Sequence, residues 1–65
     1  MQIILNGEQR EIAASVLADA LIELGYDTAT IATAVNGTFV AARLRASTSL
    51  RAGDAIEVVA PRHGG

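Results

Sequence analysis

Two Asn-Gly dipeptides, Asn6-Gly7 and Asn36-Gly37, lie between apolar and polar segments of this 65-residue chain. Asn-Gly favours a tight type I′ turn, because both turn positions require a positive φ that these two residues tolerate. Segments suited to β-strands flank each dipeptide, so the sequence predicts two hairpin-like connections. The predicted strands are 1–5, 8–12, 31–35 and 38–40.

The segment between the two hairpins has the pattern of a helix that packs on a sheet. Its apolar residues recur at i, i+3, i+4 and i+7, which places them on one stripe. Ser15 is the expected N-cap and Gly25 the expected C′ residue, so the predicted helix spans 16–24. Asp19 and Glu23 fall on its outer side. The apolar stripe consists of Leu17, Ala20, Leu21 and Leu24.

The remainder of the chain is expected to hold a turn and one more strand. Residues 41–48 have no clear period and are expected to contain a helical turn, and 50–54 form a turn in which Gly53 takes a positive φ. A strand follows at 55–60, and Pro61 ends it, because proline has no N–H for a sheet ladder. Alternation along this strand places Ile56 and Val58 in the core and Glu57 and Val59 on the outer face.

This order of elements predicts an α+β fold. A hairpin followed by a helix that crosses back produces a mixed sheet with one face covered by the helix. The first and last strands are expected to run parallel at the centre of the sheet. The predicted domain is 1–61, and 62–65 form a flexible tail that leaves in line with the last strand.

Composition excludes several classes of function. Without cysteine the chain forms no disulfide, carries no thioester or persulfide on a side chain, and has only one histidine and its carboxylates for a metal. Seven acidic residues against five arginines, with no lysine, leave no basic tract for nucleic acid, Arg43, Arg45 and Arg51 being the nearest approach. No run approaches the roughly 18 apolar residues of a membrane span, and no signal peptide is present, so a cytoplasmic location is expected.

The last four residues, Arg62-His63-Gly64-Gly65, carry the chemistry that the rest of the chain lacks. Glycine has no Cβ, so a diglycine end passes through a narrow channel and presents its carboxylate to an active site on another protein. His63 has no orienting partner nearby in the sequence. With Arg62 it is expected to contact acidic groups or phosphate in such a channel.

Six short motifs follow one another along the chain: 1–7 (MQIILNG), 16–21 (VLADAL), 34–37 (AVNG), the turn Leu50-x-x-Gly53-Asp54, 56–59 (IEVV), and Gly64-Gly65. No single motif is specific, but the order of all six at this length, ending in diglycine, is specific. On these residues the whole chain resembles the β-grasp (ubiquitin-like) sulfur carriers, and most closely the ThiS-type carriers of thiamine thiazole synthesis.

The resemblance implies a mechanism and a set of partners. A ThiF-type adenylating enzyme uses ATP to activate the carboxylate of Gly65, and a sulfur donor such as a cysteine desulfurase then supplies the sulfur of a thiocarboxylate. A ThiG-type thiazole synthase accepts that sulfur. The carrier itself is a co-substrate that binds no cofactor, holds no catalytic residue and is a monomer when free.

Docking on such partners calls for exposed apolar surface beside the tail. Ile4 and Val59 are predicted to lie on the outer faces of neighbouring central strands, and they are the leading candidates for this surface. Phe39 is either a third member of it or a core residue.

Three alternatives remain open at this point. In the first, the chain is the same kind of carrier, but its sulfur acceptor is molybdopterin, a cysteine precursor or transfer RNA. The sequence leaves the acceptor open, because Val40 is followed by Ala41-Ala42-Arg43 where family members often have Val-Pro-Arg, and the tryptophan often found a few residues later is missing. Alternatively, the chain is a ubiquitin-like modifier that forms an isopeptide through Gly65, or an interaction module whose glycines are incidental.

Overall fold

The computed structural model of the chain describes residues 1–60, and its elements follow the predicted order. Five short strands form one sheet, a seven-residue helix crosses beneath it, and two 3₁₀ helices lie in the connections. The elements are β1 (Gln2–Leu5), β2 (Glu8–Glu11), α1 (Leu17–Glu23), η1 (Thr28–Thr30), β3 (Ala32–Val35), β4 (Thr38–Val40), η2 (Ala42–Ser47) and β5 (Ala55–Val59).

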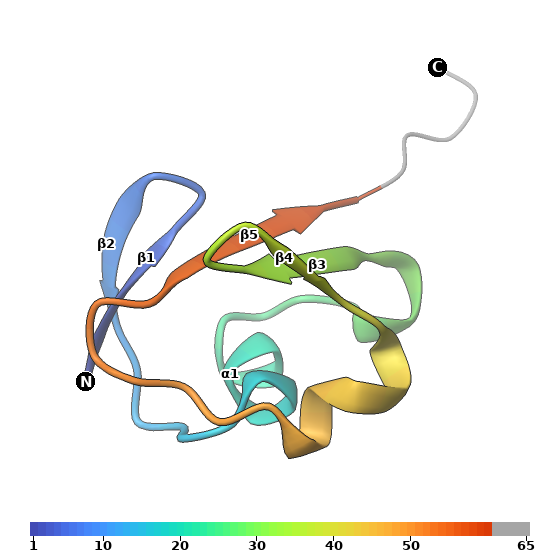
Figure 1. Cartoon of the computed structure of the whole chain (residues 1–65), viewed down its shortest axis with the longest axis horizontal. Coiled ribbons are helices and arrows are strands. Elements are labelled where there is room, and N and C mark those ends of the chain that lie inside the picture. The colour runs from blue at the N-terminus through green and yellow to red at the C-terminus, as the bar shows by residue number, and fades with distance from the viewer. Residues whose placement is uncertain (61–65) are drawn as a thin grey trace.

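The sheet is mixed, with strand order β2-β1-β5-β3-β4 (Figure 1). The first and last strands run parallel at its centre, where Leu5 is opposite Ile56, and all other neighbours are antiparallel. The predicted α+β fold, with a mixed sheet packed on one helix, is therefore confirmed. Charged residues occupy the β2 edge, where every residue is exposed, and such charge discourages pairing with another chain.

Both Asn-Gly turns have the backbone conformation that the sequence predicts. The φ values are 47° at Asn6 and 86° at Gly7, and 51° at Asn36 and 83° at Gly37. Positive φ at both central residues is the signature of the type I′ turn, whose twist matches that of the flanking strands. Gly53 also has the expected positive φ, 89°, in the turn before β5.

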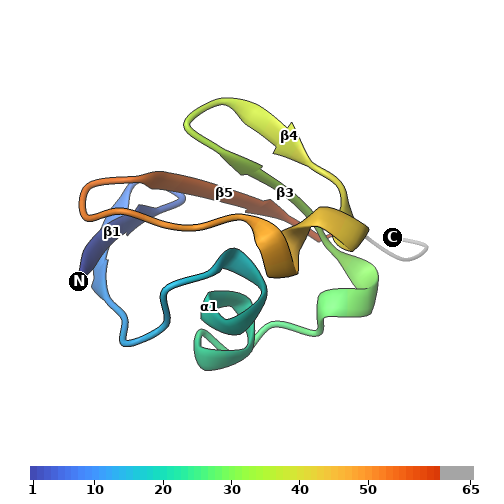
Figure 2. The ribbon, with the colours of Figure 1, turned by 60° about the horizontal axis from the view of Figure 1, so that its bottom comes forward.

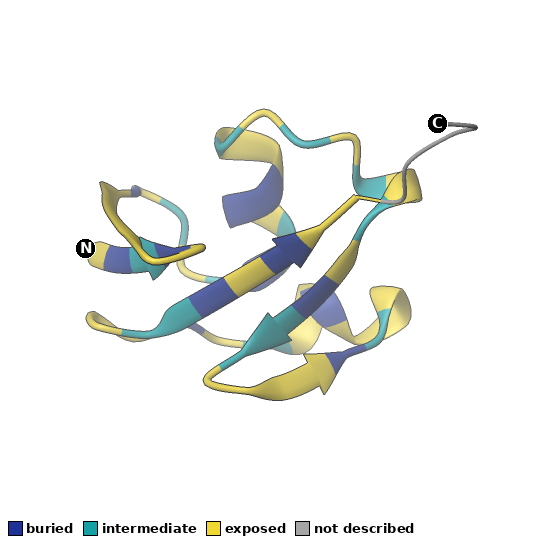
Figure 3. Cartoon of the chain, turned by 90° about the horizontal axis from the view of Figure 1, so that it is seen from above, coloured by how far each residue is buried: buried dark blue, intermediate teal, exposed yellow. Residues whose placement is uncertain are grey.

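The hydrophobic core lies between the sheet and α1 (Figure 2). The buried residues of α1 are Leu17, Ala20 and Leu21, and Leu24 packs against their edge, as the apolar stripe predicts. Along β5 the burial alternates residue by residue, with Ile56 and Val58 buried and Glu57 and Val59 exposed (Figure 3). The strands contribute Ile3 and Leu5 to the same core.

The start of α1 differs from the prediction. Ser15 is not the N-cap: the cap is Val16, in an extended conformation and without a side-chain hydrogen bond. The reason is a long-range pairing, in which the Leu17 N–H donates to the Thr48 carbonyl and the Leu50 N–H donates to the Ser15 carbonyl, both at 2.9 Å. A backbone carbonyl from a distant segment thus takes the place of a side-chain cap.

The other end of the helix agrees with the prediction. Gly25, with φ 88°, follows the helix, and its N–H donates to the Ile22 carbonyl. A left-handed residue at this position is a common way to end a helix. No helix within residues 1–60 has the length and hydropathy needed to cross a membrane.

Candidate partner-docking surface

The tail residues Arg62, His63, Gly64 and Gly65 lie outside the residues that the structure describes, as does Pro61. The expected division into a domain at 1–61 and a flexible tail at 62–65 therefore stays a prediction. What the structure describes is the strand that leads to the tail, β5, and the surface beside its last residues.

The sheet face opposite α1 carries an apolar surface at the β5–β3–β4 side. Phe39 and Val59 are 68% and 65% exposed, so Phe39 is a surface residue and not part of the core. Ala34 is opposite Phe39, and Ala32 is opposite Val59, which joins the two large side chains through two small ones. We call Ala32, Ala34, Phe39 and Val59 the outer-face patch.

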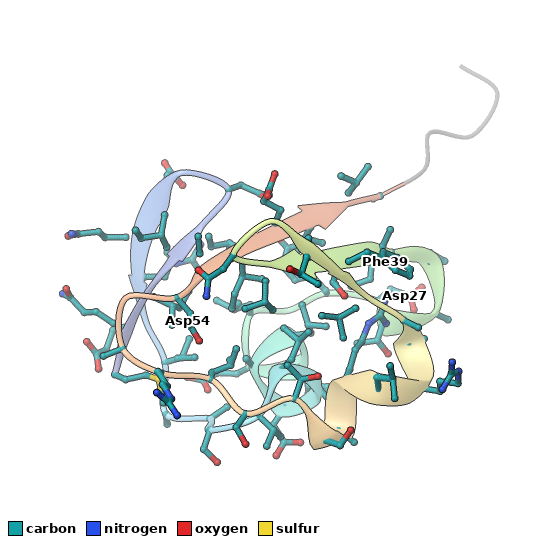
Figure 4. The ribbon with its side chains drawn as sticks, in the orientation of Figure 1. Asp27, Phe39 and Asp54 are labelled. Carbon is teal, nitrogen blue, oxygen red and sulfur yellow. The ribbon has the colours of Figure 1, made fainter. Side chains whose placement is uncertain are left out.

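The outer-face patch borders a shallow hollow of about 210 Å³. Thr33 and the exposed side chain of Glu57 complete its lining, so Glu57 adds one carboxylate to otherwise apolar and small residues. In Figure 4, Phe39 lies toward the end of the sheet at which β5 finishes, and Asp54 lies at the other end, in the loop before β5. A partner that covers this hollow has to match an apolar surface with one negative charge.

Ile4 shares the outer face but lies apart from the outer-face patch. It is half-buried, where alternation alone predicts an exposed residue, and its neighbours in the sheet are Gln9 and Ala55. Ala55 is at the start of β5, four residues before Val59, a separation of about 13 Å along a strand. The structure thus brings Phe39 and Val59 to one surface and places Ile4 in a second hollow with Gln9 and Gly53.

Two acidic side chains hold the connections around the sheet. The Asp54 carboxylate accepts hydrogen bonds from the Asn36 side-chain amide at 3.0 Å and from the Arg51 N–H at 2.8 Å, and these bonds, in that order, lower the pKa of Asp54. The Glu23 carboxylate accepts from the N–H groups of Ala13 and Ala14, and these bonds lower the pKa of Glu23. Glu23 thereby ties the last turn of α1 to the segment that precedes the helix.

The lowered pKa of Glu23 predicts an acid-sensitive contribution to stability. A folded-state pKa below the unfolded value favours folding at neutral pH, and the contribution is lost as the pH falls through the folded-state pKa. We expect wild type to be more stable than Glu23→Gln near neutrality, with the difference shrinking below about pH 4. The difference in stability is measured from urea unfolding midpoints of the two proteins between neutral pH and pH values below about 4. A constant difference would contradict this reading of Glu23, and Asp19→Gln, on the exposed side of the same helix, is the control.

Arg45 is a structural residue that sequence reasoning missed. It is 5% exposed and donates to three oxygens: Thr33 Oγ1 at 3.2 Å, and the carbonyls of Thr28 at 2.9 Å and Ile31 at 2.8 Å. It therefore cannot join Arg43 and Arg51 in an exposed basic surface. No ion pair to Arg45 occurs among residues 1–60.

The described part of the chain, residues 1–60, contains no group of three or more His, Cys, Asp or Glu side chains placed to hold a metal ion.

Comparison with known proteins identifies the family. The family model described as the ThiS family matches residues 3–65, nearly the whole chain. The chain belongs to the ThiS family. ThiS-family proteins are sulfur carriers and not catalysts, so membership implies a sulfur carrier role in thiamine biosynthesis, with partners of the ThiF and ThiG types.

Solved structures agree on the fold. The crystal structure of the thiamine biosynthesis protein ThiS from Geobacter metallireducens superposes with a TM-score of 0.84, at 20% identity and with both chains fully covered. The solution structure of a thiamine biosynthesis protein from the same organism gives 0.80, also at 20% identity, and covers all of this chain and 88% of that one. These matches confirm the β-grasp fold. A search of curated proteins found no match.

Proposed function

We propose that the carboxylate of Gly65 is the group that carries the sulfur. In the first step a carboxylate oxygen bonds to the α-phosphorus of ATP and pyrophosphate leaves, which forms an acyl-adenylate. In the second step the outer sulfur of a persulfide on the donor attacks the acyl carbon, and AMP leaves with that oxygen, which forms an acyl disulfide between Gly65 and the donor. A thiol, such as the cysteine in the mixture, then attacks the donor-side sulfur, so that a disulfide forms and a thiocarboxylate is released on Gly65. This thiocarboxylate passes its sulfur to thiazole formation.

The observation that carries this proposal is the ThiS-family match over residues 3–65, which includes the terminal diglycine. Two features of the chain support it. The chain has no cysteine side chain to hold sulfur, and the last strand ends at Val59, six residues before Gly65. Six residues reach at most about 20 Å, which is enough to enter an active site while the sheet stays docked outside it.

The test is the intact mass of the chain after incubation with ATP, cysteine, a cysteine desulfurase and a ThiF-type adenylating enzyme. We expect the mass to rise by the difference between sulfur and oxygen, and only when ATP is present. A chain whose mass is unchanged in a mixture that loads another ThiS-family protein would refute the proposal. A covalent conjugate of higher mass would favour a ubiquitin-like modifier, and transfer of the sulfur to molybdopterin, a cysteine precursor or transfer RNA would identify another acceptor.

We further propose that the outer-face patch docks on the adenylating enzyme. Phe39 and Val59 expose large apolar side chains on the outer face of the sheet, and Val59 is the last residue of β5, the strand that leads to the tail. An aromatic residue desolvated at the centre of an interface commonly contributes about 2 kcal/mol or more to binding. Ile4, the third residue expected at this surface, lies about 13 Å away along the strand direction, so its contribution is expected to be smaller.

Phe39→Ser is accordingly expected to weaken binding to a ThiF-type enzyme by roughly 10- to 30-fold, and Val59→Ser by a smaller factor. Neither change touches a buried side chain, so the fold should be retained. Calorimetric titration measures the affinity. Ile22→Ser is the matched control, because Ile22 is 67% exposed on α1, on the opposite face of the sheet. Equal losses for Phe39→Ser and Ile22→Ser would contradict docking through the outer-face patch.

A further inference from the structure

The last residues of β5 lack a strand on one side. β1 pairs with β5 only as far as Leu5, opposite Ile56, and the chain then turns away at Asn6. On the other side β3 continues to pair as far as Val59, opposite Ala32. Successive residues of a strand direct their N–H and C=O groups to opposite neighbours. The backbone of Val58 therefore faces the side on which β1 has already ended.

The side chain of Asn6 takes the place of the missing strand. Its Oδ1 accepts from the Val58 N–H at 2.9 Å, and its Nδ2 donates to the Val58 carbonyl at 3.3 Å. The N–H of Asn6 also donates to the Ile56 carbonyl at 2.9 Å. A single side chain thus satisfies both backbone groups of Val58, 52 residues away in the sequence.

Among the common residues, Asn is the one suited both to the positive φ of this turn position and to the two hydrogen bonds with Val58. Asn6 has φ 47°, a left-handed conformation that Asn and Gly adopt most readily. The side-chain amide offers one acceptor and one donor in the arrangement of a peptide group. Glycine would keep the turn but lose both bonds, and aspartate would keep the acceptor while directing a second oxygen toward the Val58 carbonyl.

We propose that Asn6 is a positioning residue for sulfur loading, because it fixes the end of β5 at Val58, four residues before the predicted tail at 62–65. This inference rests on the proposed function. Val58 is seven residues before Gly65, so a displacement at Val58 shifts the point from which these last residues have to reach the active site. A displacement of about 1 Å at a reacting group can lower a rate by about 100-fold. Holding β5 from both sides raises the fraction of docked complexes in which the carboxylate lies at reacting distance.

The chain contains a matched control in the second Asn-Gly turn. Asn36 has φ 51°, and it holds the opposite end of β5: its Oδ1 accepts from the Ala55 N–H at 2.9 Å, and its own N–H donates to the Ala55 carbonyl at 2.7 Å. Asn36 also bonds to Asp54, so its loss should destabilise the fold at least as much. Asn36 does not line the hollow at the outer-face patch.

The experiment compares Asn6→Gly, Asn36→Gly and wild type as substrates of a ThiF-type adenylating enzyme, by carrier-dependent exchange of pyrophosphate into ATP. Asn6→Gly is expected to lower kcat by about tenfold with KM changed less than about twofold, because docking is retained while the carboxylate is less well placed. Asn36→Gly is expected to change neither by more than about twofold. Asn6→Asp, which keeps the acceptor, should lie between Asn6→Gly and wild type.

A second measurement does not depend on the enzyme. The amide of Val58 is expected to exchange with solvent at least about tenfold faster in Asn6→Gly than in wild type, and at a rate close to wild type in Asn36→Gly. Equal kcat values for the two glycine variants, or an unchanged Val58 exchange rate, would overturn the inference. Should Asn6→Gly fail to fold, Asn6→Asp decides by the same two criteria. A wild-type chain that is not adenylated would refute the proposed function, and with it this inference.

Discussion

Deletion of Gly65 is expected to abolish sulfur loading, with a loss of at least about 100-fold in the rate of adenylation. The shortened chain ends in the carboxylate of Gly64, which lies one residue, about 3.5 Å, short of the required position. The fold should not change, since the last strand ends at Val59. Intact mass after incubation with ATP and the sulfur-loading enzymes measures the product, and circular dichroism checks the fold.

The control for this deletion is Gly65→Ala, which keeps the length of the chain and adds a single methyl group. If the active site recognises chain length alone, the alanine variant loads as well as wild type. If it requires a residue without a side chain in a narrow channel, the alanine variant loads slowly, as the deletion variant does. A deletion variant that loads at the wild-type rate would contradict the assignment of sulfur to Gly65, and an interaction module would retain partner binding after the deletion.

Arg45→Ala is expected to lower the free energy of unfolding by about 3 kcal/mol. The truncation leaves the carbonyls of Thr28 and Ile31 without their charged donor, and it removes the donor to Thr33. Part of this loss is offset, because the buried guanidinium has no carboxylate partner among residues 1–60. In a domain of this size such a change lowers the Tm by roughly 12 to 24 °C. Thermal or urea unfolding measures it.

Arg43→Ala provides the matched control, since Arg43 is exposed in the same 3₁₀ helix, η2. Its effect is expected to stay within about 0.5 kcal/mol, as is usual for surface substitutions. Arg45→Lys should fall between the two, because one ammonium group cannot bond to three separated oxygens as the planar guanidinium does. Equal effects of Arg43→Ala and Arg45→Ala would show that the buried hydrogen bonds of Arg45 make no net contribution to the free energy of unfolding.

Arg45 also matters for the position of the docking surface. Its three acceptors lie on η1, on the residue before β3 and on β3 itself. Thr33 in turn donates to the Val40 carbonyl at 3.0 Å, which joins β3 to the end of β4. The outer-face patch is built on these two strands and on β5. The buried face of the sheet therefore fixes the strands whose opposite face is proposed to meet the partner.

Much of the fold was predictable because the signals are local. A type I′ turn depends on the φ preferences of two adjacent residues, and both Asn-Gly turns formed where they were expected. The stripe of α1 and the alternation of β5 depend only on the periods of a helix and a strand. The diglycine end depends on no fold at all, and the hypothesis for Gly65 rested on the sequence alone.

The features that only the tertiary structure decided depend on which distant segments meet. Ser15 has the chemistry of an N-cap, but its backbone carbonyl accepts a hydrogen bond from the Leu50 N–H, and the helix begins after Val16 instead. Nothing in the local sequence distinguishes the buried Arg45 from the exposed Arg43. Alternation placed Ile4 and Val59 on one face, whereas their separation along the sheet follows from the register of β1 against β5. Hydrogen bonds between residues far apart in sequence, such as those of Asn6 to Val58, leave no local pattern, because each partner alone is an ordinary turn or strand residue.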